Sequence, residues 1–287
     1  MPVVVETIAG LRALIREARS DAASSGQGQP RVALVPTMGA LHDGHLALVD
    51  RARESADLVI VSIFINPLQF APGEDLDRYP RSLDSDLQAL AAADVVFTPA
   101  RDEIYPDGTL QTRVIAGQVG SLFEGKTRRG HFDGVLTVVA KLINIATPDL
   151  IVFGQKDAQQ VFLVKRMVAD LDIDVEVATV ETVRDDDGLA LSSRNRYLDE
   201  RQRIAARAIP RSLEAAESSA DRGTEAVLAA AQSVLAGDQA VELDYLAVVD
   251  PRTFLPVDSD HRGKAIVLVA ARVGDTRLID NAPVRVA

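Results

Sequence analysis

The sequence predicts an α/β fold, with helices on both faces of a parallel sheet, followed by a smaller C-terminal α+β domain with an antiparallel sheet. Short apolar segments alternate with amphipathic helical segments through residues 1–183, which is the pattern of a parallel sheet. Residues 58–65 are almost continuously apolar, as expected of a strand buried on both faces. After residue 183, two helical segments precede three clustered strands. We therefore predict two domains, residues 1–183 and residues 184–287.

The elements of the first domain follow from the spacing of apolar residues. An amphipathic helix is predicted at residues 5–19 and a polar loop at 20–30. Apolar runs bounded by polar residues predict strands at 31–35, 58–65, 94–98, 112–116, 150–153 and 175–180. Helical spacing predicts helices at 46–55, 83–93, 134–146 and 158–171. Residues 71–81 and 121–133 are rich in Pro, Gly or charged residues, which favours loops.

The second domain begins with a polar, glycine-containing loop at residues 184–196, which we expect to be mobile. Apolar spacing then predicts helices at 199–217 and 223–236. Three strands are predicted at 242–249, 265–271 and 276–281. Helices followed by clustered strands are typical of a small α+β domain.

Composition excludes several classes of function. The chain has 287 residues and no cysteine, so it has no disulfide, thiolate metal site or thiol nucleophile. Its net charge of −11 argues against non-specific binding to nucleic acid or to an anionic membrane. The longest apolar run is far shorter than a membrane span, and the N-terminus lacks a signal-peptide pattern. We expect a cytoplasmic protein.

One stretch joins the predicted strand at 31–35 to the helix at 46–55: Pro-Thr-Met-Gly-Ala-Leu-His-Asp-Gly-His. Gly39 and Gly44 allow a tight turn. His42 and His45 stand three residues apart at the helix entrance, and this spacing puts both on one face. The free N–H groups of a helix start favour an anion, so the turn predicts a phosphate site. Zinc is a less favoured use, because the chain offers no cysteine and few other histidines.

Other polar groups follow the strands at 58–65 and 150–153. Asn66 and Gln69 come after the first, and Lys156, Asp157 and Gln160 after the second. Because ligands bind beyond the carboxyl ends of parallel strands, we expect these segments and the His-containing turn to meet in one crevice. Lys156 suits phosphate but also a solvated surface position. Asp157 is equally well explained as an ordinary first-turn acid of a helix.

The predicted loop at 184–196 contains Ser192, Ser193 and Arg194. Two hydroxyls and a guanidinium in a flexible loop suit a clamp that closes on phosphates. The alternative is a hydrophilic linker. No histidine stands beside either serine, so Ser–His nucleophilic catalysis has no local support.

Taken together, these motifs resemble the pantoate–β-alanine ligase family. This family belongs to the nucleotidyltransferase superfamily, which also contains class I aminoacyl-tRNA synthetases. The resemblance runs nearly end to end and implies a Rossmann-like first domain and a C-terminal lid domain. It is carried by six blocks: PTMGALHDGH from Pro36, FINPLQF from Phe64, RYPR from Arg78, GHFDGV from Gly130, FGQKDAQQ from Phe153 and LSSRN from Leu191.

The resemblance implies an ATP-dependent, amide-forming ligase of pantothenate biosynthesis. Pantoate's carboxylate attacks the α-phosphorus of ATP, which gives pantoyl adenylate and pyrophosphate. The amine of β-alanine then attacks the acyl carbon, which gives pantothenate and AMP. Mg²⁺ is implied with ATP, and a homodimer is implied as the assembly. We expect small-molecule partners only, with no nucleic acid and no membrane.

The resemblance also implies roles for individual residues. The catalytic residues are His42, His45, Lys156 and Arg194. ATP is bound by Met38, His42, His45, Gly154, Lys156, Asp157, Ser192, Ser193 and Arg194. Pantoate is bound by Met38, Asn66, Gln69, His131 and Gln160. Asp86 is a candidate for an outer-shell role toward Mg²⁺.

Two positions depart from the family's usual pattern. Leu191 stands where Met is common, and Ala158 stands where a larger residue, often Tyr, is common. Neither change removes a charged group, so we expect effects on nucleotide packing or affinity only.

The His-containing turn would also suit two other functions. A nucleotidylyltransferase would leave AMP on its product, and a non-catalytic module would only bind nucleotide. Asn66, Gln69 and Gln160 suit a small hydroxy acid and favour the ligase. Lys156 and the serine loop argue against mere binding, because binding alone does not require groups on two sides of the phosphates.

Overall fold

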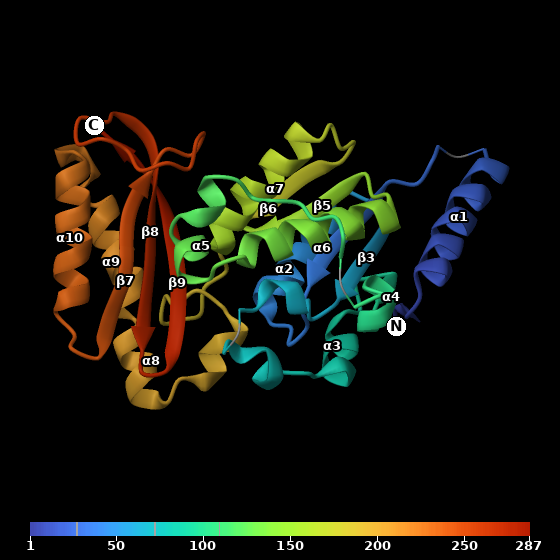
Figure 1. Cartoon of the computed structure of the whole chain (residues 1–287), viewed down its shortest axis with the longest axis horizontal. Helices are drawn as coiled ribbons and strands as arrows, with labels where there is room; N and C mark the ends of the chain where they lie inside the picture. Colours follow the sequence, from blue (N-terminus) through green and yellow to red (C-terminus); the bar gives the residue numbers. More distant parts are fainter. Residues whose placement is uncertain (27, 72, 109) are drawn as a thin grey trace. The chain divides into compact units, whose positions relative to one another are not determined.

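The computed structural model describes residues 1–26, 28–71, 73–108 and 110–287 (Figure 1). The chain divides into two compact units. The first comprises Met1–Gln155 and Leu163–Val180, and the second comprises Lys156–Phe162 and Glu181–Ala287. The second unit therefore takes a short segment that the predicted domain of residues 1–183 would include.

The first unit contains a six-stranded sheet in which every paired neighbour is parallel. The strands are β1 Val3–Val5, β2 Val32–Thr37, β3 Leu58–Ile63, β4 Val95–Phe97, β5 Leu150–Gly154 and β6 Glu176–Val180. They lie in the order β1-β4-β3-β2-β5-β6, so β2 has β3 on one side and β5 on the other. The strand order reverses there, which makes the carboxyl ends of β2 and β5 the expected place for a ligand.

Helices cover both faces of this sheet, as predicted. The main ones are α1 Ile8–Ser24, α2 Asp43–Arg53, α3 Leu83–Ala89, α6 His131–Ala146 and α7 Ala158–Asp170. Ala33 and Val35 of β2 pack with Leu48 and Val49 of α2 in one core cluster. Leu34 lies between them and is also buried, and because side chains alternate along a strand it faces the other side. That face is contacted by α6.

The second unit contains an antiparallel sheet of β7 Val241–Val249, β8 Gly263–Val273 and β9 Thr276–Val286, in that order (Figure 1). Its helices are α8 Glu200–Ala206, α9 Ala208–Glu217 and α10 Thr224–Ala236. Alternate residues of β8, from Ala265 to Ala271, form a core with apolar residues of α9 and α10. The predicted α+β character of this region is confirmed.

The N-terminal prediction was partly wrong. The strand β1 was not predicted. The first helix begins only at Ile8 and extends into the predicted loop as far as Ser24. Thr7 sets the helix start, because its hydroxyl accepts a hydrogen bond from the N–H of Gly10 at 3.1 Å. A strand of three residues is too short to show a period.

The predicted strand at 112–116 is absent from the structure, which describes all five of these residues. Two of its backbone N–H groups donate to side chains of α6 instead of to a neighbouring strand. Val114 donates to Thr137 at 3.1 Å and Ala116 donates to Asp133 at 2.9 Å. Side chains from a distant helix satisfy this backbone, and local β-propensity does not predict that.

Other helices also differ from their predicted bounds. The helix predicted from residue 134 begins at His131, and a short helix, α5 Glu124–Thr127, lies in the predicted loop before it. The predicted helix at 199–217 is two helices that meet at Arg207. Pro210 explains the break, because proline lacks an N–H and is tolerated only in the first turn of a helix. No helix among the described residues has the length and apolar character needed to cross a membrane.

Candidate active site

The turn between β2 and α2 lies at the carboxyl end of the strand where the sheet order reverses. His42 is the N-cap of α2 and His45 is its third residue. Their ring centroids are 4.1 Å apart. The N–H of His42 donates to Nδ1 of His45 at 3.4 Å. A neutral imidazole that accepts at Nδ1 carries its proton on Nε2, so His45 has a donor on its far side.

Asp86, in the first turn of α3, holds this turn in place. The residue is 3% exposed. Oδ2 accepts a hydrogen bond from the N–H of Ala40 at 2.9 Å, and Oδ1 accepts one from the N–H of Leu41, also at 2.9 Å. The hydroxyl of Ser82 donates to Oδ1 at 3.2 Å. Both oxygens are thus occupied, and the carboxylate anchors the backbone immediately before His42.

The closeness of Asp86 to the turn also explains why residue 39 is a glycine. Its φ of +81° lies in the left-handed region, which glycine adopts without strain. A Cβ at this position would also lie 3.0 Å from Oδ2 of Asp86. The glycine therefore lets the turn approach the buried carboxylate.

The structure brings together three of the residues predicted to bind pantoate. Asn66 is the N-cap, and Gln69 the last residue, of the short 3-10 turn Pro67–Gln69 that follows β3. Nδ2 of Asn66 donates to Oε1 of Gln69 at 3.2 Å. Nε2 of Gln69 in turn lies 2.9 Å from Sδ of Met38, in the turn after β2. Two neighbouring strands thus place an amide–amide–thioether cluster at their carboxyl ends.

Two residues that were not among the predicted site residues support this cluster. The hydroxyl of Tyr105 donates to Oδ1 of Asn66 at 2.8 Å, and burial raises the pKa of this phenol, so it stays a donor. Gly134 of α6 accepts from Nδ2 of Asn66 at 3.0 Å. A Cβ on Gly134 would lie 2.2 Å from the carbonyl oxygen of Leu68. A glycine inside an apolar helix was the available signal for this close approach.

His131 reaches the same cluster from the start of α6. The residue is 9% exposed, and its Nδ1 lies 2.8 Å from the backbone oxygen of Gln69. Its Nε2 lies 3.0 Å from Nη1 of Arg128. Burial first, and then the charge of Arg128, lower the pKa of His131 to about 4. The imidazole is therefore neutral at physiological pH.

The second unit carries the predicted residues that follow β5. Lys156 lies in a 3-10 turn, Gln155–Asp157, that leads into α7. Its Nζ is 3.5 Å from Oδ1 of Asp157, and its side chain is 20% exposed. Its backbone oxygen accepts from Nδ2 of Asn281 of β9 at 2.9 Å. Gln160 lies one turn further along α7 and is half-buried.

The serine loop of the second unit has its own local order. Ser192 caps a 3-10 helix, Ser193–Tyr197, and its hydroxyl accepts from the N–H of Arg194 at 3.3 Å. At the base of the loop, Arg184 binds the carboxylate of Asp280 through two hydrogen bonds of 2.7 and 3.1 Å. This bidentate ion pair fixes the start of the loop to β9.

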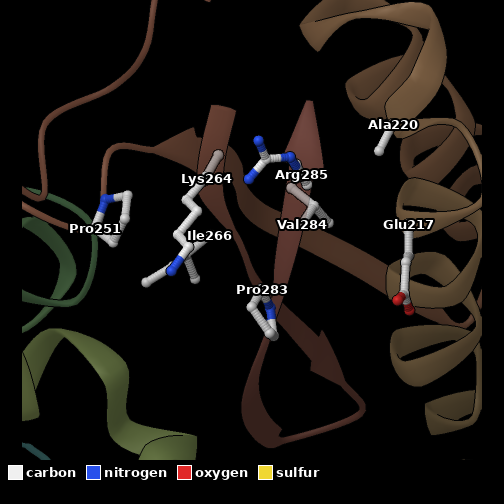
Figure 2. A pocket seen from close by; sticks show the side chains of 9 residues that line it. Glu217, Ala220, Pro251, Lys264, Ile266, Pro283, Val284 and Arg285 are labelled. Carbon is white, nitrogen blue, oxygen red and sulfur yellow. The ribbon is translucent and has the colours of Figure 1, made fainter. Parts of the chain in front are cut away.

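A pocket of about 620 Å³ opens on the C-terminal sheet of the second unit (Figure 2). Lys264 and Arg285 line it from directly paired positions of β8 and β9. Glu217 of α9 lines it from the helical side (Figure 2). None of the predicted site residues lines this pocket, so we assign it no part in the reaction.

A parallel sheet that reverses its strand order beside a histidine-bearing helix start is typical of α/β enzymes that bind nucleotides. Comparison with known proteins narrows this class. A family profile described as pantoate-beta-alanine ligase matches residues 3–283. The chain belongs to the pantoate–β-alanine ligase family.

Similar proteins agree with this assignment. A pantothenate synthetase of Leifsonia xyli subsp. xyli is 57% identical over 278 residues, which cover 96% of this chain and 97% of that protein. The pantothenate synthetase of Thermus thermophilus has a crystal structure that matches with a TM-score of 0.88 at 45% identity, covering 98% of each chain. A structure of pantoate-β-alanine ligase from Francisella tularensis, complexed with β,γ-ATP and β-alanine, has a TM-score of 0.79 at 33% identity and covers 98% of this chain and 97% of that one.

These comparisons confirm four predictions: the family, the fold class, the function as a pantoate–β-alanine ligase and the enzyme class, an ATP-dependent ligase. They also support small molecules as substrates.

Proposed function

We propose that this chain joins pantoate to β-alanine through a pantoyl-adenylate intermediate. In the first step an oxygen of pantoate's carboxylate bonds to the α-phosphorus of ATP, and the bond from that phosphorus to the bridging oxygen breaks. Pyrophosphate leaves with the electron pair. In the second step the neutral amine of β-alanine bonds to the acyl carbon, AMP leaves, and the nitrogen loses a proton. The polar cluster of Met38, Asn66 and Gln69 is the observation that best supports this function.

The pantoate role of Gln69 follows from which of its atoms are already occupied. Asn66 donates to Oε1, so that oxygen is engaged. One hydrogen of Nε2 points at Met38, and the other is left to donate to a carboxylate or hydroxyl of pantoate. We propose that Asn66 and His131 hold Gln69 in place for this contact. Met38 is proposed to pack against the apolar part of pantoate. Gln160 is proposed as a second amide for pantoate.

His42 and His45 are proposed to bind ATP phosphates at the N-terminus of α2. A helix start carries partial positive charge and directs backbone N–H groups outward. The Nε2–H of His45 adds a neutral donor, as its Nδ1 accepts from the backbone. Negative charge grows on the leaving pyrophosphate, and donors fixed in advance stabilise such charge without reorganising.

Residues of the second unit are proposed to bind phosphate oxygens of ATP through cations and hydroxyls. Lys156 and Arg194 would offset the charge of the triphosphate, and Ser192 and Ser193 would donate to its oxygens. Gly154, which ends β5, and Asp157 are proposed to bind the adenosine part. No nucleophilic side chain is required, because pantoate itself is the nucleophile.

Mg²⁺ is proposed to enter with ATP, where it would offset the repulsion between two anionic reactants. Among the described residues, no group of three or more His, Cys, Asp or Glu is placed to hold a metal. Both oxygens of Asp86 already accept hydrogen bonds. We therefore propose that phosphate oxygens and water hold the ion, with Asp86 at most beyond its first shell. A homodimer, a cytoplasmic location and the domain boundary after residue 183 stay predictions.

Pyrophosphate release tests the proposed function. The purified chain is mixed with pantoate, ATP and Mg²⁺, and β-alanine is added later. We expect a burst of pyrophosphate close to one per active chain that depends on pantoate, followed by steady release of AMP and pantothenate once β-alanine is present. Release that ignores pantoate, or AMP that stays on the product, would contradict the proposal.

A further inference from the structure

We propose that Arg128 and Glu74 form a positioning pair for pantoate recognition, acting through His131 on the backbone of Gln69. Neither residue was among the predicted site residues, and neither is proposed to touch a substrate. The inference rests on the proposed function, because it needs Gln69 to bind pantoate. It adds a reason why the Gln69 amide keeps one orientation.

The pair itself is well fixed. Nη2 of Arg128 donates to Oε2 of Glu74 at 2.8 Å, and its Nε donates to Oε1 at 3.1 Å. The two side chains are 16% and 21% exposed. A two-pronged pair of this kind fixes the plane of the guanidinium, which a single contact does not.

The guanidinium then decides where the proton of His131 lies. Arginine only donates hydrogen bonds, and its Nη1 lies 3.0 Å from Nε2 of His131. Nε2 must therefore accept, which leaves the ring proton on Nδ1. Nδ1 donates to the backbone oxygen of Gln69 at 2.8 Å, and Nη2 of Arg128 donates to the same oxygen at 3.3 Å.

Gln69 needs this outside support because its own turn is weakly bonded. In the 3-10 turn the N–H of Gln69 donates to Asn66 at 3.4 Å, and the N–H of Phe70 donates to Pro67 at 3.3 Å. Both bonds are long for backbone amides. Two donors on the Gln69 carbonyl therefore set the direction in which its side chain leaves the backbone. A misplacement of about 1 Å at a reacting group is enough to cost roughly a hundredfold in rate.

The test compares steady-state kinetics of four single variants. Arg128→Met removes the hydrogen-bond donors but keeps most of the side-chain volume. Arg128→Lys keeps the positive charge but cannot form the bidentate contact of a guanidinium. Glu74→Gln removes the negative charge and so the ion pair. Arg53→Met is the matched control, because Arg53 also forms an ion pair, with Asp94 at 2.6 Å, and has no proposed role in the reaction.

We expect Arg128→Met to raise the KM for pantoate about tenfold, the cost of roughly one misplaced hydrogen bond, with the KM for ATP nearly unchanged. Glu74→Gln should act in the same direction and Arg128→Lys should act less. Arg53→Met should leave both KM values unchanged. If Arg128→Met does not fold, Arg128→Lys and Glu74→Gln decide the outcome.

A double variant separates positioning from a merely structural role. Because Arg128 acts through Gln69, Arg128→Met should add little to the pantoate KM of Gln69→Ala. Loss of melting temperature without a selective rise in pantoate KM, or additive effects in the double variant, would overturn the inference. If Gln69→Ala alone leaves the pantoate KM unchanged, the pantoate assignment fails first. A large effect of Gln69→Ala with none from Arg128→Met or Glu74→Gln contradicts only the positioning pair.

Discussion

The side-chain amide of Asn66 donates to the side-chain oxygen of Gln69 at 3.2 Å. This one bond turns the Gln69 amide so that its nitrogen, and not its oxygen, is available to a ligand. Asn66 is 1% exposed, and its side-chain oxygen accepts a hydrogen bond from the hydroxyl of Tyr105. The orientation of the proposed pantoate contact is thus decided within a buried network.

Asn66→Asp should weaken pantoate binding. A carboxylate at this position cannot donate to Gln69 or to the backbone of Gly134, and it places a negative charge near an anionic substrate. We expect the KM for pantoate to rise about tenfold or more, as for the loss of one or two hydrogen bonds, while the KM for ATP changes little. Initial-rate kinetics at varied pantoate measure this, and equal effects on both substrates would exclude a pantoate-specific role.

His45→Ala should impair adenylate formation more than the amine step. Its Nε2–H is proposed to donate to phosphate while negative charge grows on pyrophosphate. Pyrophosphate forms in the first step, so this charge does not develop when β-alanine reacts. Single-turnover assays that start either from ATP and pantoate or from pre-made pantoyl adenylate separate the two steps. A similar loss in both assays would show that His45 serves another purpose.

Lys156→Ala should lower kcat by about a hundredfold or more, because a fixed cation that stabilises developing charge is lost. Lys156→Arg should recover part of the rate. Lys165 lies on α7, the helix that follows the turn of Lys156, and it is exposed. It serves as the matched control, so Lys165→Ala should be close to wild type. A near wild-type kcat for Lys156→Ala would remove its assigned role.

Asp86→Ala should destabilise the protein and reduce activity together. It leaves the N–H groups of Ala40, which is buried, and Leu41, which is half-buried, without their acceptor. We expect a cost of roughly 3 kcal/mol in the free energy of unfolding. Urea unfolding measures this loss. Asp84→Ala is the control, because Asp84 lies in the same helical turn but is exposed. Equal stabilities of the two variants would show that Asp86 is not an anchor.

The stability of the chain should fall as the pH falls from 6.5 to 4 in a way that depends on His131. Its pKa is about 4 when folded and 6.5 ordinarily, so in this range the unfolded chain binds a proton that the folded chain does not. Protonation of His131 therefore costs the folded state nothing above pH 6.5. Near pH 4 it lowers the free energy of unfolding by roughly 3 kcal/mol. Urea unfolding at pH 7 and pH 4.5 should show a larger loss for the wild type than for His131→Gln. Equal losses would mean that His131 is not held neutral.

The sequence predicted the parallel sheet and the histidine turn because both leave local signals. Buried strands read as apolar runs, and His42 and His45 stand within a motif. The supports of the site do not. Asp86 lies far along the chain from Leu41, and Arg128 lies far from Gln69, so no short pattern links them. The same limit made the predicted strand at 112–116 wrong, because its N–H groups are taken by side chains of α6.

An isotope experiment tests the adenylate route most directly. Pantoate labelled with ¹⁸O in its carboxylate is turned over with ATP, Mg²⁺ and β-alanine, and the products are examined by mass spectrometry. If the carboxylate oxygen bonds to the α-phosphorus, each AMP formed carries one labelled oxygen and pyrophosphate carries none. Label in pyrophosphate or inorganic phosphate, or AMP without label, would contradict the adenylate mechanism.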